Sequence, residues 1–481
     1  MSFGELGLFA LALYVVALVG VAELASRARR DLSPSDHFLA GRELGVFVLF
    51  LTLYATAYSG NSLLGYPGKA YRSGFSFIMS TGFMMSIIVV FHALVPRLRP
   101  LAVAEGFVTP GDWVRHRFGR GAAAQALLIS VGILMTLALV NFLLAQLKAM
   151  GHVTSQVTGG RIPYEWGVIG LAALILFYET RGGMRAVAWT DAAQGVLMFV
   201  GLGALLIWLL GEAGGMASVT RAVAAVRPEA VAVPDAQVCA NWFSTIALLG
   251  LASVIYPQVI QRVYAAKSGQ ALKRSFALMS FMPLVTTTVV TLIGVAAIAR
   301  LELGGGVASD SVMPALLGEW AAGGTLPSLA AAIVFMGALA AIMSTADSCL
   351  LSLGSLLARD LLGGSGRDAR TTRVGKLLAA VLLVAMIPIA LQRDITLWRL
   401  IELKMELLIQ CVPAFLLAIH WGGLRPLPTL LGLLAGTAFG VGLTLAGVAQ
   451  LGGVHAGVVG LGLNLAVAVV GSRLGGRRSV V

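Results

Sequence analysis

The chain has 481 residues, of which 58% are hydrophobic and only 12% are charged. Soluble domains carry about a quarter charged residues, so a soluble fold could not hide this much apolar surface. The net charge of +12 lies in short basic clusters between apolar runs, a pattern typical of membrane topology signals that argues against nucleic acid as a partner.

Thirteen apolar segments are long enough to cross a hydrocarbon core of about 30 Å, which takes roughly 20 helical residues. Their expected spans are 3–26, 44–66, 74–97, 121–148, 161–180, 187–211, 241–263, 275–300, 326–361, 373–391, 396–420, 426–448 and 453–473. We therefore predict an all-α, polytopic membrane protein with a single transmembrane domain over residues 1–481.

The first segment lacks the basic start of a signal peptide and carries Glu5 instead, so we expect a retained helix. Loops on one predicted side, at 27–43, 97–120, 181–186, 262–275, 359–376 and 425, plus the tail, hold 24 of the 34 Lys/Arg. The positive-inside rule then places the N-terminus outside and the C-terminus in the cytoplasm. The expected location is the plasma membrane or the bacterial inner membrane. The chain ends shortly after the last segment, so we expect no attached signalling domain.

The second segment is polar where its apolar middle should be, from Tyr54 to Ser62. Gly60, Gly65 and Pro67 weaken its helical continuity, and a break there would expose carbonyl oxygens that suit a hard cation. A tight helix contact made by small residues explains the pattern equally well.

Two further segments carry polar residues. Asp191 enters the sixth segment, where an acid near a helix N-terminus favoured by the dipole is the simpler explanation. Tyr256-Pro257-Gln258 interrupts the seventh and could place a second break opposite the first.

In the ninth segment Ser344, Asp347 and Ser348 share one helix face, with Thr345 beside it. A buried lone carboxylate either protonates or finds a cation. A small cation is the simplest partner here, and an arginine from another helix is the alternative.

The eleventh segment contains Arg399, Glu402, Lys404, Glu406 and Gln410. Charges at this depth must face protein or water, so they line a solute pathway or form a structural ion-pair network. The sequence leaves both possibilities open.

Motifs for nucleotide binding, hydrolysis and metal binding are absent from the sequence, and Cys239, Cys349 and Cys411 are widely separated. We expect neither an enzyme nor a metal other than sodium. The two interrupted segments lie five positions apart, which suggests inverted repeats at 44–211 and 241–420 with ligands bound where the broken helices meet.

The chain resembles the sodium:solute symporter family across essentially all thirteen segments. The matching stretches are Phe38 to Arg42, the second segment as far as Gly74, Gly182-Gly183 through Asp191 to Gln194, and Ala341 to Asp360 with "AAIMSTADS" and a terminal "ARD". The resemblance implies the LeuT-like fold: a five-plus-five inverted repeat with one helix before it and two after.

The resemblance also implies a sodium site. Its ligands would be backbone carbonyls of Ala55, Tyr58 and Ala341 and hydroxyls of Ser344 and Thr345. Some family members have a second sodium site, which here would use Asp191, Ser344, Asp347 and Ser348. In this chain Asp347 provides a carboxylate where those members usually have a hydroxyl. The number of bound Na⁺ ions, one or two, therefore remains open.

By the same resemblance, we expect sodium-coupled import of a small organic carboxylate such as an amino acid or pantothenate. Proline carriers have an aspartate where Ala57 stands, which argues against proline. The solute would lie among Tyr58, Ser59, Asn61, Tyr256, Gln258 and Gln410, with Glu402, Lys404 and Glu406 along its pathway. The expected partners are this solute and the lipid bilayer, without an obligate protein partner.

Three alternatives share this architecture. One is a proton-coupled carrier that uses Asp347 or Asp191, one is a transporter-like membrane sensor, and one is a passive channel. An enzyme is the least favoured class, because the sequence shows no nucleophile and base set.

Overall fold

The computed structural model describes residues 3–27, 34–302, 306–364, 369–392 and 396–474. The side chains of residues 3, 22, 25, 26, 61, 178–183, 186, 193, 194, 302 and 369 lie outside this description. These include Gly182, Gly183 and Gln194 of the family-like stretch. The first-half helices are α1 (Phe3–Arg27), α2 (Pro34–Leu39), α3 (Val46–Ala57), α4 (Tyr66–Ser73), α5 (Met79–Ala104), α6 (Pro110–Phe118), α7 (Ala122–Val157), α8 (Tyr164–Ala213) and α9 (Met216–Val226).

The second-half helices are α10 (Ala236–Ser253), α11 (Pro257–Ala265), α12 (Gly269–Met279), α13 (Thr288–Glu302), α14 (Val312–Ala322), α15 (Thr325–Ser355), α16 (Ala369–Ala390), α17 (Leu397–Leu408), α18 (Ala418–His420), α19 (Pro426–Leu445) and α20 (Ala456–Leu474). Short 3₁₀ or π turns join several of them, including η2 (Asn61–Gly65), η5 (Pro283–Thr287), η7 (Leu356–Leu361) and η8 (Ile409–Cys411). The strands β1 (Gln450–Leu451) and β2 (Val454–His455) form a small antiparallel hairpin between α19 and α20.

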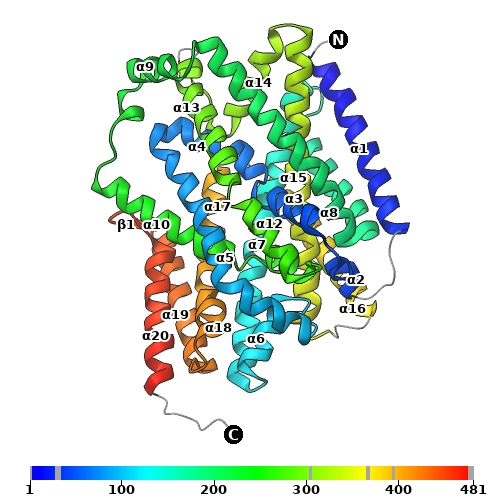
Figure 1. Ribbon diagram of the computed structural model, residues 1–481, viewed down its shortest axis with the longest axis vertical. Coiled ribbons are helices and arrows are strands. Elements are labelled where there is room, and N and C mark those ends of the chain that lie inside the picture. The colour runs from blue at the N-terminus through cyan, green and yellow to red at the C-terminus, as the bar shows by residue number, and fades with distance from the viewer. Residues whose placement is uncertain (1–2, 28–33, 303–305, 365–368, 393–395, 475–481) are drawn as a thin grey trace.

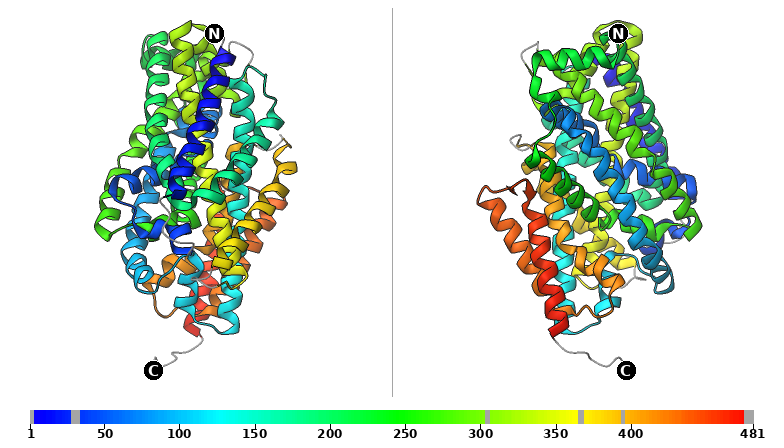
Figure 2. Two further views of the ribbon diagram at one scale, coloured as in Figure 1. Left: turned by 90° about the vertical axis from the view of Figure 1, so that its right-hand side faces the viewer. Right: turned by 60° about the vertical axis from the view of Figure 1, so that its left-hand side comes forward.

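The helix α15 forms the centre of the bundle and packs against α7, α8 and α16 (Figure 1). Every residue from Gly337 to Ser355 is buried. Small residues permit this close packing: a Cβ on Gly337 would lie 3.2 Å from the Met198 backbone of α8. The helix α1 lies on the outside of the bundle against α8 (Figure 2, left).

Ten helices of the described residues are long and apolar enough to span a membrane, against the thirteen predicted. The second predicted segment is divided, with only Val46–Ala57 before the break. The fifth and sixth both fall within α8, which continues through the loop expected at 181–186. The eleventh is divided into α17, η8, π turn η9 (Pro413–Leu417) and α18, so it contains no long uninterrupted helix.

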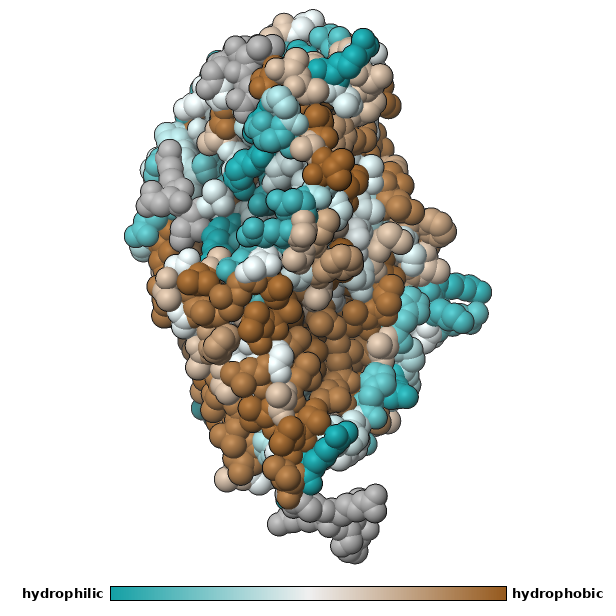
Figure 3. All heavy atoms as spheres, turned by 90° about the vertical axis from the view of Figure 1, so that its left-hand side faces the viewer, coloured by the Kyte–Doolittle hydropathy of each residue, from teal (hydrophilic) through white to brown (hydrophobic). Residues whose placement is uncertain are grey.

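The surface has the composition that a bilayer requires. Hydrophobic side chains cover the lower part of the face in Figure 3, where α19 and α20 lie, and hydrophilic side chains surround a hollow above it. That hollow is lined by Lys69, Ser73, Glu229, Asp235, Gln237 and Asn241, among others. The two ends of the described chain lie at opposite ends of the long axis (Figure 1).

Candidate functional site

The first half of the site is the break after α3. The Tyr58 N–H donates to the Tyr54 carbonyl at 2.9 Å, and the backbone then leaves the helix. A helix end leaves its last four carbonyls without intrahelical donors, and here these include the carbonyls of Ala55 and Tyr58. The Gly60 N–H turns away and donates to Gln146 Oε1 at 3.2 Å.

The break lies directly against α15. A Cβ on Gly60 would collide with the Ile342 side chain, so glycine allows the two backbones to approach. The carbonyl of Ala341 and the hydroxyls of Ser344 and Thr345 follow within one turn of Ile342. The structure therefore brings together the two stretches that hold the five predicted sodium ligands.

Two hydroxyls on α15 differ in their surroundings. Ser344 Oγ donates to Asp191 Oδ1 of α8. Thr345 is fully buried, and its Oγ1 has no hydrogen-bond partner in the described part of the chain. Because an unpaired buried hydroxyl costs roughly 1–3 kcal/mol, Thr345 Oγ1 is a candidate ligand atom.

Asp191 belongs to a buried ion pair that the sequence analysis did not anticipate. Arg262 Nη2 lies 3.0 Å from Asp191 Oδ2, and both side chains are 0% exposed. The guanidinium also donates to Ser348 Oγ at 2.6 Å and to Thr52 Oγ1 at 2.9 Å. Thr52 Oγ1 in turn donates to Asp191, so the cluster joins α3, α8, α11 and α15.

This cluster corrects one expectation. The loop predicted at 262–275 starts later, because Arg262 lies inside α11 and is not a loop charge. Asp347 itself is fully buried one turn beyond Ser344. Two of the four residues named for a second sodium ion, Asp191 and Ser348, thus contact a cation that the protein supplies.

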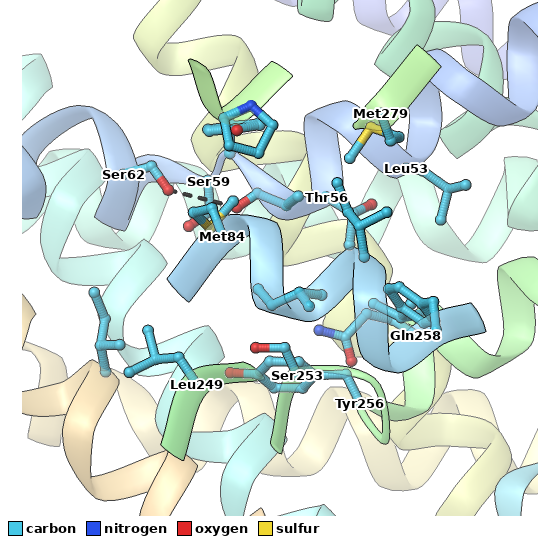
Figure 4. A pocket seen from close by; sticks show the side chains of 18 of the residues that line it. Leu53, Thr56, Ser59, Ser62, Met84, Leu249, Ser253, Tyr256, Gln258 and Met279 are labelled. Carbon is cyan, nitrogen blue, oxygen red and sulfur yellow. Dashed lines mark hydrogen bonds between the residues drawn. The ribbon is translucent and has the colours of Figure 1, made fainter. Parts of the chain in front are cut away.

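A cavity lies next to the sodium candidates, between the two broken helices. Thr56, Ser59 and Ser62 line it from the α3 side, and Ser253, Tyr256 and Gln258 line it from the α10–α11 break (Figure 4). The space between its walls, including its open part, is about 840 Å³.

Of the residues predicted to bind the solute, some line the cavity and one does not. Tyr58, Ser59, Tyr256 and Gln258 line the cavity, and the side chain of Asn61 lies outside the described residues. Gln410 does not line it. Its Nε2 donates to the Gly457 carbonyl of α20 at 2.8 Å, and Asn464 donates back to the Gln410 carbonyl at 2.8 Å.

The charges of α17 also separate. Glu402 accepts from Arg399 at 3.0 Å and from the Trp398 indole at 2.6 Å. Glu406 accepts from Thr444 at 3.2 Å and lies 3.8 Å from His455. Lys404 thus lines the cavity, whereas Glu402 and Glu406 belong to local networks.

Comparisons with known proteins identify a family and relatives that this chain resembles. Residues 37–436 match the sodium:solute symporter family. The osmoregulated proline transporter OpuE of Bacillus subtilis is 25% identical over 97% of this chain and 94% of its own. The sodium/pantothenate symporter of Escherichia coli is 26% identical over 77% and 76%. A structure of a Na⁺-coupled sialic acid symporter in a substrate-bound outward-open state superposes with a TM-score of 0.80 at 18% identity, covering 98% of both chains.

Proposed function

Because this chain belongs to the sodium:solute symporter family and is a sodium-coupled symporter of small organic solutes, we propose that its solute is an organic carboxylate. An amino acid and pantothenate are the first candidates, since relatives are named for proline and pantothenate. The solute would occupy the cavity between the two breaks, with Tyr58, Ser59, Tyr256 and Gln258 as its polar contacts. The chain is a multi-pass membrane protein, and we propose that its N-terminus is outside.

We propose that a sodium ion binds between α3 and α15. The support is the convergence of helix-end carbonyls at Ala55 and Tyr58 with the unpaired hydroxyl of Thr345 and the hydroxyl of Ser344. Sodium there would hold the break of α3 against α15 and stabilise the conformation that forms the cavity. A solute that prefers this conformation then binds more tightly in the presence of sodium.

We propose one such ion for each transport cycle. Arg262 is paired with Asp191 and Ser348, two of the residues named for a second ion. A second sodium would have to displace a guanidinium or share its carboxylate, at the cost of placing two cations together in a buried site. The inverted repeats at 44–211 and 241–420 remain part of the proposal, supported by the two breaks that face one another (Figure 4).

The test is Thr345→Val, which keeps the shape of the side chain and removes its oxygen. Loss of one ligand of a charged group should raise the sodium concentration for half-maximal uptake at least about tenfold. Uptake is measured in proteoliposomes with and without an inward sodium gradient. Thr429→Val is the matched control, because Thr429 is a buried helical threonine that donates to the Arg425 carbonyl on α19.

Unchanged sodium dependence in Thr345→Val would contradict the site. Uptake that persists without sodium and collapses when the proton gradient is removed would contradict sodium coupling altogether.

A further inference from the structure

The cavity has an unusual charge balance. Among the described residues, its lining contains one ionisable lysine, Lys404, and no aspartate or glutamate. Most of the remaining wall is apolar, formed by residues such as Leu53, Ile88, Phe91, Leu249 and Ile401. A solute in this cavity therefore meets one basic side chain and no acid among the described residues.

Lys404 is 2% exposed, and its ammonium has neither an ion pair nor a hydrogen bond among the described residues. The nearest acids of its own helix are engaged elsewhere, Glu402 with Arg399 and Glu406 near His455. The Lys404 Nζ lies 3.1 Å from the centroid of the Phe142 ring and 5.6 Å from that of Tyr256. Aromatic faces attract a cation but do not neutralise it, so the burial of this charge is only partly offset.

Two polar atoms of the cavity wall also lack protein partners. Tyr256 Oη and Gln258 Oε1 are buried and make no hydrogen bond within the described part of the chain. The phenol can donate to an anion, and the amide oxygen can accept from a hydroxyl or amide N–H. Together with Lys404 they specify a ligand with one anionic group, one neutral donor and an apolar body.

We propose that the cavity binds its solute as a monocarboxylate that carries no cationic group, with the carboxylate on Lys404 and a hydroxyl or amide donor near Gln258. This inference rests on the proposed function and narrows it, because it selects hydroxy or amido acids over zwitterionic amino acids. An amino acid would bring an ammonium group into a cavity that offers it no acid. A neutral solute would leave Lys404 buried without a counter-ion.

The test uses ligand pairs that differ only in charge. One pair is 2-hydroxy-4-methylpentanoate and leucine, in which a hydroxyl replaces the ammonium. The other is pantothenate and panthenol, in which the carboxylate is replaced by an alcohol. Binding is measured as the rise in melting temperature of the purified full-length protein in sodium buffer, titrated to give an apparent Kd.

We expect each monocarboxylate to bind at least about tenfold more tightly than its partner. Lys404→Met should remove this preference and weaken the monocarboxylates by at least about tenfold, whereas Lys404→Arg should retain it. Lys69→Met is the matched control, because that lysine stacks over Trp398 outside the cavity and should leave both affinities unchanged.

The rise in melting temperature caused by sodium alone separates the proposed sodium site from the proposed monocarboxylate site. Stabilisation of the ligand-free protein by sodium, and its loss in Thr345→Val, tests the sodium site without any solute. It also shows whether Lys404→Met is folded. With that sodium effect intact, the inference is overturned by equal or tighter binding of leucine, by unchanged affinity in Lys404→Met, or by a failure of both monocarboxylates to bind.

Discussion

Among single residues, Arg262 connects the helices of the candidate site. It is fully buried and is bonded to Asp191, Ser348 and Thr52 on three other helices. Removing one partner of a buried pair leaves the other charge uncompensated, which typically costs about 3–5 kcal/mol. The arginine is therefore both a structural tie and, as we propose, a permanent replacement for a second transported cation.

Replacing Arg262 with Gln tests this role. Removal of the guanidinium leaves Asp191 with the hydroxyls of Ser344 and Thr52, a set that can accept a free cation. We expect the Hill coefficient for sodium to be near one in the unchanged protein and to rise in Arg262→Gln. Sodium-dependent uptake in proteoliposomes gives the Hill coefficient of each protein. Arg99→Gln is the control, because it removes an arginine that donates to a backbone carbonyl, that of Ala266. A coefficient near two in the unchanged protein would contradict the single ion.

The sequence located much of this site but not its central pair. Asp191, Ser344 and Ser348 could be selected because each is a polar residue in an apolar helix. Arg262 follows directly after the break at Pro257 and was counted as a loop charge, since its burial depends on helices that are distant in the chain. Gln410 illustrates the reverse case, because its partners on α20 are 47 and 54 residues away and no local pattern indicates them.

Among the elements, the short helix α6 contacts η7, the turn that directly follows the C-terminal end of α15. Asp360 accepts from Thr109 Oγ1 at 2.6 Å and from the Gly111 N–H at 3.1 Å, so it caps the N-terminus of α6 from outside. Arg359 pairs with Asp112 at 2.9 Å. These contacts give the terminal "ARD" of the family-like stretch a physical role in fixing the end of the helix that bears Ser344.

Asp360→Ala should lower the free energy of unfolding by about 3 kcal/mol, because it leaves a buried N–H and a hydroxyl unpaired beside Arg115. Melting followed by tryptophan fluorescence measures the loss. Asp235→Ala is the comparison, since Asp235 caps α10 through the Val238 N–H at 2.8 Å in an exposed position and should cost only about 1 kcal/mol. Equal losses of melting temperature in Asp360→Ala and Asp235→Ala would show that the contact with α6 stabilises the protein no more than an exposed helix cap does.

The sequence predicts interruptions within a helix better than it predicts where two expected segments form one continuous helix. Gly60 and Pro257 disrupt hydrogen bonding locally, so the interruptions of the second and seventh segments could be located from sequence. The extension of α8 across 181–186 could not, because glycines and arginines there indicate a loop when read alone. The turns that divide the eleventh segment also lacked a signal, apart from Pro413.

At the scale of the whole molecule, the asymmetric distribution of Lys and Arg predicts the orientation, and the native cysteines can test it. Cys349 and Cys411 are fully buried, and Cys239 is partly exposed in the first turn of α10. The nearby hollow of Asp235, Gln237 and Asn241 belongs to the predicted outer side.

A membrane-impermeant maleimide should label Cys239 in sealed right-side-out vesicles and not in sealed inside-out vesicles. Labelling is read as a mass shift on the intact protein, and Cys239→Ser should abolish it. The opposite pattern would reverse the orientation and place the N-terminus in the cytoplasm.

The contact between η8 and the terminal helices connects the cavity to the lipid around the protein. Gln410 and Glu406 attach the segment that carries Lys404 to α19 and α20, through the Gly457 carbonyl, Asn464 and Thr444. If α17 tilts, α19 and α20 therefore move with it, and the outer faces of these two helices contact lipid acyl chains. The work of each turnover then includes displacing those chains, so membrane thickness and fluidity become part of the energetics of the carrier.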